Sequence, residues 1–229
     1  MTSFDRRAVI TGAIAAVGAA SLPRAAMAAA GGPAIPLPAG NALHFDVYRN
    51  NKLFGKYQTI FNVVGNVITV TSDVAMSMKI ANMTVFDYQH HCEEIWRDGR
   101  FAEMRSHSLR DKGKTEADTV TAVRTDFDVH VTTNKGPLSV PIEACPLTHW
   151  NQATLSGKLF NPQDGLLLDL TAHPMGRDAV TIAKGSQITA NHFALRGAQT
   201  LDEWYDDGGI WAGLKAIFPD KSVIEYRRV

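Results

Sequence analysis

The densest group of side chains that could carry chemistry lies between residues 86 and 109. Asp98-Gly99 separates two segments of alternating polarity, and this dipeptide favours a two-residue type I′ turn between antiparallel strands. Such a turn would set facing pairs on one face of the sheet. The pairs would be Trp96 with Phe101, Glu94 with Glu103, Cys92 with Arg105, His90 with His107, and Tyr88 with Leu109. The sequence therefore predicts a polar patch with opposed imidazoles and opposed carboxylates.

This patch has three possible interpretations. Facing carboxylates repel unless a proton or a cation lies between them, and Arg105 is close enough to Glu103 to form a salt-bridged cluster. His90 and His107 could instead hold a metal ion, although the sequence lacks a recognised ligand spacing, so we expect no metal and no cofactor. The same histidines, with Glu94 and Glu103, could also act as acid–base groups of an enzyme.

Two further clusters combine aromatic and polar side chains, at residues 148–151 and 204–207. Each could line the mouth of a pocket, and each could equally belong to a core with one polar end. Taken with the hairpin, the predicted ligand-binding residues are Tyr88, His90, Glu94, Trp96, Arg105, His149, Trp150, Trp204 and Tyr205.

The elements that position these residues are β-strands. From Leu43 onward, segments with period-two alternation are separated by short turn signals at 50–51, 65–66, 98–99, 134–136 and 207–209. We expect an all-β fold, a long-stranded antiparallel meander that forms a curved half-barrel or barrel, with at most one or two short helices, one of them near 147–155. A sandwich of two flat sheets would produce the same alternation.

The N-terminal residues predict export. Arg6-Arg7 precede an uncharged stretch, and Ala26-Met27-Ala28 offers small residues for cleavage, so 1–28 is expected to be a twin-arginine-type signal peptide. An ordinary secretory signal with a chance arginine pair is the alternative. We expect residues 29–40 to be a flexible leader and 41–229 a single β domain in the periplasm, with the twin-arginine export machinery and signal peptidase as partners during maturation.

The charge of the chain limits the kinds of partner that we expect, and its cysteine content limits the number of disulfides. Removal of residues 1–28 takes away three arginines and one aspartate from 23 basic and 23 acidic residues, which leaves 20 and 22. A nearly neutral chain gives no indication of a nucleic-acid partner or of an anionic membrane surface. Cys92 and Cys145 could form one disulfide in an oxidising compartment, or they could be two free thiols.

The chain also resembles a known family over nearly its whole mature length. The residues that carry the resemblance are Tyr48-Arg49-Asn50-Asn51-Lys52 through Gly55, His90 with Glu94 to Arg100, His149-Trp150-Asn151, Trp204-Tyr205-Asp206 and Ile224-Glu225-Tyr226. In these it is similar to the exported bacterial proteins described as domain of unknown function 6134. The resemblance implies a long-stranded sheet like the half-barrels of periplasmic lipoprotein carriers, and it implies no activity or ligand.

Three functional hypotheses follow. The first is a periplasmic protein that binds an apolar or amphipathic small molecule, or a lipid, in a cavity of the curved sheet. The second is an enzyme that uses the His90/His107 and Glu94/Glu103 face, with or without a metal. The third is an envelope scaffold that a partner recognises through an exposed edge of the sheet.

Overall fold

The computed structural model describes residues 35–80, 83–110 and 118–229. The predicted signal peptide lies outside these residues. In chain order the elements are η1 (Ala39–Asn41), β1 (Ala42–Arg49), β2 (Lys52–Val64), β3 (Val67–Ile80), β4 (Met83–Arg97), β5 (Arg100–Arg110), β6 (Asp118–Arg124), β7 (Asp128–Thr133), β8 (Gly136–Pro141), β9 (Cys145–Pro146), η2 (Gln152–Ser156), β10 (Leu159–Phe160), β11 (Leu167–Leu168), β12 (Leu170–Thr181), η3 (Ala183–Gly185), β13 (Gln187–Gly197), β14 (Thr200–Tyr205), β15 (Trp211–Ile217) and β16 (Val223–Arg228).

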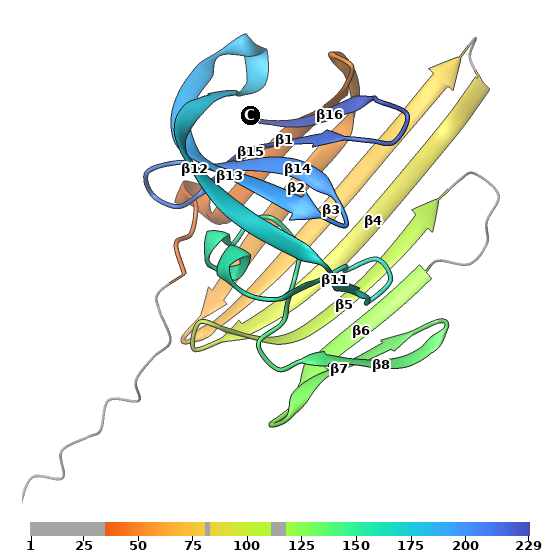
Figure 1. Ribbon diagram of the computed structural model, residues 1–229, viewed down its shortest axis with the longest axis vertical. Helices are drawn as coiled ribbons and strands as arrows, with labels where there is room; N and C mark the ends of the chain where they lie inside the picture. Colours follow the sequence, from red (N-terminus) through yellow and green to blue (C-terminus); the bar gives the residue numbers. More distant parts are fainter. Residues whose placement is uncertain (1–34, 81–82, 111–117) are drawn as a thin grey trace, which may run out of the picture. The chain divides into compact units, whose positions relative to one another are not determined.

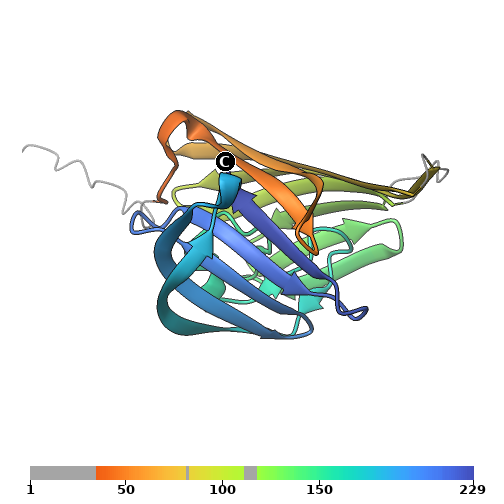
Figure 2. The same cartoon turned by 90° about the horizontal axis from the view of Figure 1, so that it is seen from above.

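One large antiparallel sheet dominates the fold (Figure 1). It has 13 strands in the order β12-β13-β14-β15-β16-β1-β2-β3-β4-β5-β6-β7-β8. Figure 2 shows that the sheet bends, so that β12–β16 lie across from the strands that follow β1. The predicted all-β meander is confirmed. The architecture is an open half-barrel rather than a closed barrel or a sandwich of two sheets, because β12 and β8 remain as edges of one continuous sheet.

Both edge strands carry features that limit pairing with another chain. β12 contains Pro174 and a register irregularity beside it, and β8 contains Pro137 and Pro141. Proline removes a backbone donor, and a bulge bends an edge away from a regular ladder. The edges of the described sheet therefore give little support to a scaffold that is recognised by strand addition.

Alternation and turn chemistry account for the long strands. In β1, Leu43, Phe45 and Val47 are buried while His44 is exposed, as expected for a sheet with one core face. The β4–β5 connection is the predicted tight turn, since Asp98 and Gly99 have φ angles of 50° and 73°. Positive φ at both central residues is the signature of a type I′ turn.

A segment between β8 and β12 fills the concave side of the sheet. This inner segment, residues 142–168, contains η2 and a small sheet in the order β11-β10-β9. Its side chains Leu147, Trp150, Leu155, Leu159 and Phe160 belong to the same buried cluster as the large sheet. The short helix predicted near 147–155 is a 3₁₀ helix at Gln152–Ser156, capped by the Asn151 side chain.

The predicted register of the β4–β5 hairpin is wrong beyond the pair of Trp96 with Phe101. Trp96 faces Phe101, but Ile95 faces Glu103, so Ala102 is an additional, unpaired residue. A bulge of one residue moves every later side chain of that strand to the other face. Further along the hairpin, Tyr88 faces Arg110, His90 faces Ser108, His91 faces His107, Cys92 faces Ser106, Glu93 faces Arg105, and Glu94 faces Met104.

The structure also bears on the predicted disulfide and on the predicted flexible leader. Both cysteines are free thiols in the structure, with Cys92 buried and Cys145 partly buried. Burial is the main cause that raises the pKa of the Cys145 thiol to about 12. Of the predicted flexible leader, Ile35 and Leu37 pack against the main core, so its last part is ordered by apolar contacts.

Gly55 lies where β2 passes close to β3. A Cβ atom at residue 55 would lie 2.2 Å from the carbonyl oxygen of Ala75. We therefore expect Gly55→Ala to lower the free energy of unfolding by about 1–3 kcal/mol, measured by urea denaturation. Gly157→Ala is the control, because a Cβ there meets its nearest neighbour at 3.6 Å. An equal loss in both variants would contradict this explanation.

Candidate functional site

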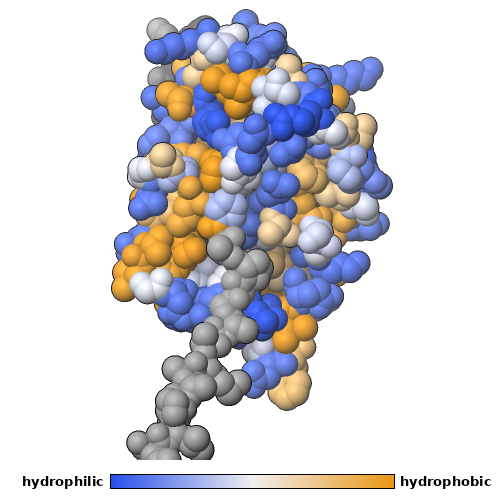
Figure 3. Space-filling model, turned by 90° about the vertical axis from the view of Figure 1, so that its left-hand side faces the viewer, coloured by the Kyte–Doolittle hydropathy of each residue, from blue (hydrophilic) through white to orange (hydrophobic). Residues whose placement is uncertain are grey.

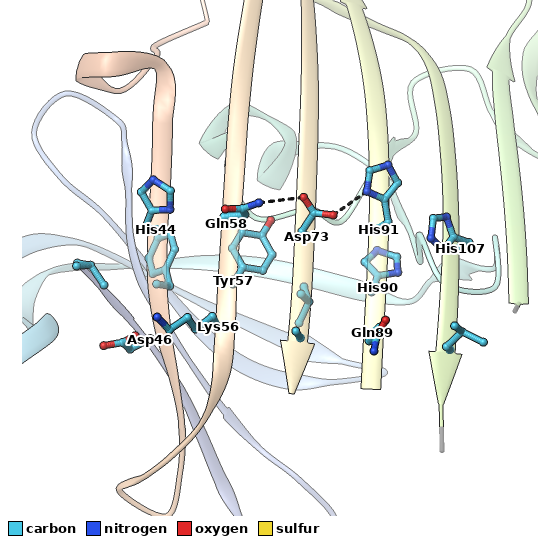
Figure 4. Close-up of a pocket in the computed structure, with 15 residues that line it drawn as sticks. His44, Asp46, Lys56, Tyr57, Gln58, Asp73, Gln89, His90, His91 and His107 are labelled. Atoms are coloured by element: carbon cyan, nitrogen blue, oxygen red, sulfur yellow. Dashed lines mark hydrogen bonds and ion pairs between the residues drawn. The ribbon is translucent and has the colours of Figure 1, made fainter. Parts of the chain in front are cut away.

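A groove of about 740 Å³ crosses β1 to β5 (Figure 4), and most of its lining residues belong to the face of the sheet that is turned away from the core. Its lining combines ionisable, amide and apolar side chains. The lining residues are His44, Phe45, Asp46, Lys56, Tyr57, Gln58, Asp73, Val74, Ala75, Gln89, His90, His91, His107, Leu109 and Val229.

Strand register sorts the residues on this face into two rows. The first row is His44, Gln58, Asp73, His91 and His107, each paired with the next across adjacent strands. The second row, one pleat along, is Asp46, Lys56, Ala75, Gln89 and Leu109. Directly opposed residues in antiparallel strands have Cβ atoms about 5 Å apart, so each row is a continuous line of neighbouring side chains.

Asp73 is the centre of the first row. Its Oδ2 accepts a hydrogen bond from Gln58 Nε2 at 3.2 Å, and its Oδ1 lies 2.7 Å from His91 Nδ1. Figure 4 shows both interactions between neighbouring strands. Partial burial opposes ionisation of Asp73, but the hydrogen bonds from His91 and Gln58 outweigh it and hold the pKa of the carboxyl below its ordinary value. Asp73 is thus an anionic hydrogen-bond acceptor at neutral pH.

His91 is oriented by this contact. Because Asp73 occupies Nδ1, the other ring nitrogen, Nε2, is left to bind a ligand, and a carboxylate partner fixes the ring in one orientation. The His91 and His107 rings stack with centroids 5.0 Å apart. The His91 and Asp73 side chains are 37% and 43% exposed, so a ligand in the groove can reach both.

The structure separates the residues that the sequence analysis placed on one catalytic or metal-binding face. His90 and Glu94 face the core, whereas Glu103, Arg105 and His107 lie on the outer face. The proposed pairs His90/His107 and Glu94/Glu103 are therefore wrong, both as a catalytic face and as a metal site. Among the described residues, no group of three or more histidine, cysteine, aspartate or glutamate side chains could hold a metal ion.

Glu94 is a fully buried carboxylate on the core face. Its two oxygens accept hydrogen bonds from the indole nitrogens of Trp150 and Trp96, each at 2.9 Å. Burial disfavours the charge and raises the pKa of Glu94 to about 7, although these indole donors oppose the shift. Glu94 thus connects β4 to the inner segment.

A second buried carboxylate holds the adjacent residue of the inner segment. Glu203 Oε1 lies 2.7 Å from His149 Nδ1, and Tyr205 donates its hydroxyl proton to Glu203 Oε2 at 2.5 Å. His149 also stacks on Trp211 at 5.3 Å. Its backbone has φ of 71°, a conformation that a histidine adopts at some cost and that its side-chain contacts help to maintain.

Most of the predicted ligand-binding side chains therefore contact other parts of the protein. Glu94, Trp96, Trp150 and Tyr205 are buried within the interior. Trp204 lies in a small separate core and stacks on His192 at 4.6 Å. Of the predicted set, only His90 also borders the groove.

Asp73, Gln58, His44 and His91 were not predicted as site residues. The prediction centred on His90 and Glu94, which face the core, whereas the groove is lined mainly from the outer face of the sheet. The alternation of polar and apolar residues along each strand is enough to place all four side chains on the outer face. Bringing them into one row also requires the pairing of three hairpins, and the two-residue turns at Asn50-Asn51 and Gly65-Asn66 supply part of it.

Within the described ranges, no helix has the length and apolar character needed to cross a bilayer. Figure 3 shows one face of the molecule, where apolar side chains form separate patches among hydrophilic ones. Scattered exposed apolar groups of this kind are ordinary for protein surfaces.

Comparison with known proteins identifies a matching family and a protein of similar fold. A family model described as "Domain of unknown function (DUF6134)" matches residues 45–229. No curated protein matches the chain. A crystal structure of a beta-barrel-like protein of domain of unknown function DUF1849 from Brucella abortus is similar, with 11% sequence identity and a TM-score of 0.58. The alignment covers 82% of this chain and 94% of the other, and at this identity it shows a common fold.

Proposed function

The chain belongs to the family of domain of unknown function DUF6134, and from that premise we propose that it is an exported protein that binds a small amphipathic molecule. One observation carries the proposal. Five adjacent strands present two rows of polar and apolar side chains to one groove, with Asp73 and His91 held in a fixed geometry at its centre. Binding sites generally combine a concave surface with a few oriented polar groups.

The groove is a better candidate site than the concave side of the half-barrel. The inner segment packs there against both halves of the sheet, with Trp150 on Phe61 and His149 on Trp211, each at 5.3 Å. A ligand between these aromatic side chains and the sheet would have to displace this buried cluster. The groove needs no such rearrangement, since its volume of about 740 Å³ falls within the range usual for small-molecule sites.

The lining also indicates what kind of molecule would fit. His91 Nε2, His107 and Gln89 offer hydrogen-bonding groups, and Lys56 and Asp46 add charges of opposite sign. Leu109 and Ala75 supply apolar surface in the second row. A molecule with a polar head over the first row and a short apolar part over the second would satisfy both. Residues 1–28 support the export part of the proposal as an expected signal peptide.

The test uses protein purified from the envelope of its source and analysed by native mass spectrometry. We expect the wild-type protein to carry a non-covalent small-molecule adduct. Asp73→Asn and His91→Gln should retain about tenfold less, because loss of one oriented hydrogen bond is worth about 1.4 kcal/mol.

Glu93→Gln is the matched control. Glu93 lies on the same strand and face as His91 but outside the groove, so this variant should retain the adduct at the wild-type level. Wild-type protein without an adduct, or equal retention in the Asp73→Asn variant, would overturn the assignment of the groove as the binding site.

A further inference from the structure

A second pocket lies on the core side of the sheet, where β5 and β6 meet the inner segment. Its volume is about 270 Å³, and its lining is polar throughout. β5 contributes Ser108 and Arg110, the β7–β8 turn contributes Lys135, and the inner segment contributes Asn161, Gln163 and Asp164. This pocket shares no lining residue with the groove.

Ser108 stands out among these residues because it has a base beside it. Its Oγ lies 2.8 Å from Nδ1 of His90, the residue that faces it across the β4–β5 pair. Both residues are buried, with exposed fractions of 6% and 8%. A hydroxyl within hydrogen-bond reach of an imidazole nitrogen is the geometry of an activated nucleophile.

His90 is an uncharged acceptor at neutral pH. Burial is the main cause that lowers the pKa of His90 to about 4, and the nearby His107 and His91 lower it further. At neutral pH the ring is therefore uncharged, and Nδ1 can accept the Ser108 proton. The tautomer that leaves Nδ1 free carries its proton on Nε2.

Tyr88 lies beside the same pair. Its ring stacks with the His90 ring at a centroid distance of 6.4 Å. Burial raises the pKa of Tyr88 to about 12, so the phenol stays protonated across the neutral range.

Ser106 shows that this arrangement is particular to Ser108. Ser106 lies two residues earlier on β5, on the same face, with the same exposed fraction of 6%. Its hydroxyl donates to the backbone carbonyl of Pro162 at 2.5 Å. Of these two buried serines, only Ser108 combines a histidine partner with a position in the pocket wall.

We propose that Ser108 is a nucleophile activated by His90, and that the pocket cleaves small polar esters. Arg110 and Lys135 are balanced by Asp118 and Asp164, so the lining selects a polar substrate without requiring a net charge. A volume of about 270 Å³ restricts the substrate to a small molecule.

The chemistry is acyl transfer to Ser108 and then to water. Ser108 Oγ forms a bond to the acyl carbon while its proton moves to His90 Nδ1. The bond from that carbon to the alkoxy oxygen breaks, and the leaving alkoxide takes the proton from His90 and departs as an alcohol. Water then attacks the acyl-serine, gives its proton to His90, and releases the carboxylic acid as Ser108 recovers its proton.

The test uses the purified chain and a fluorophosphonate probe, with labelling followed by intact mass and peptide mapping. We expect one label on Ser108 of the wild-type protein. The labelling rate should fall at least tenfold in His90→Gln, and Ser108→Ala should take up no label. Ser106→Ala should label at the wild-type rate, because the Ser106 hydroxyl donates to a backbone carbonyl and has no histidine partner.

Circular dichroism establishes that each variant is folded. If Ser108→Ala fails to fold, Ser108→Cys with iodoacetamide replaces it, and its alkylation should depend on His90 in the same way. Absence of wild-type labelling, labelling at another residue, or an unchanged rate in folded His90→Gln would overturn the proposal.

Discussion

Replacing Trp150 with alanine is expected to lower the free energy of unfolding by about 3–5 kcal/mol, as is usual for removal of a buried tryptophan. Trp150 is only 2% exposed and packs against Phe61 and Trp96, each with ring centroids 5.3 Å apart. It also donates one of the hydrogen bonds to buried Glu94. The variant loses both the packing and the donor, and urea denaturation followed by fluorescence and circular dichroism measures the change.

Two further variants divide this effect into its parts. Trp150→Phe keeps most of the ring contacts and removes the N–H donor, so it should cost about 1–3 kcal/mol. Phe127→Ala is the surface control, because Phe127 is 91% exposed and its loss should change stability by less than about 0.5 kcal/mol. A loss below about 1 kcal/mol in Trp150→Ala would mean that the inner segment does not hold the interior together.

The pH dependence of stability should contain two opposed contributions from buried groups. Burial raises the pKa of Glu94 from 4.5 to about 7, so the folded state binds a proton that the unfolded state has lost, and stability falls as pH rises through this window. Burial lowers the pKa of His90 from 6.5 to about 4, so the unfolded state binds the additional proton, and stability falls as pH falls through that window. Between pH 4.5 and 6.5 the two slopes cancel.

Replacing either residue should reveal the pH dependence of stability that the other residue produces. Glu94→Gln should lose about 3 kcal/mol relative to its own maximum as pH falls from 6.5 to 4, and His90→Gln should lose a similar amount as pH rises from 4.5 to 7. Urea denaturation at half-unit pH steps measures both profiles. Wild-type protein with a steep slope between pH 4.5 and 6.5, or variants whose profiles match it, would contradict this assignment.

Much of the fold could be predicted because short-range rules govern it. Alternation identified the strands, and Asp98-Gly99 placed the β4–β5 turn correctly. The bulge at Ala102 could not be predicted, since neither Ala102 nor its neighbours is a glycine or another residue that marks a bulge. That one residue exchanged the faces of Glu103, Arg105 and His107, and the predicted polar patch depended on all three.

The short strands of the inner segment were not predicted, for a different reason. Its strands are two residues long, and one pair, β9 with β10, is parallel. Segments this short have no detectable periodicity. The aromatic and polar clusters at 148–151 and 204–207 were noticed, but their meeting across Glu203 and His149 depends on the bend of the whole sheet. Local sequence patterns carry no information about such a contact.

The pairing of β1 with β16 has a consequence for how the chain acquires its structure. These strands lie side by side in the middle of the sheet, yet β1 precedes and β16 follows all the other strands in the sequence. The sheet therefore cannot be completed in the order in which the strands are synthesised. Until β16 is available, β1 and β15 are both unpaired edges, so folding is governed by a contact of very large sequence separation and should be slow. A nascent chain has an aggregation-prone interval that the finished protein does not.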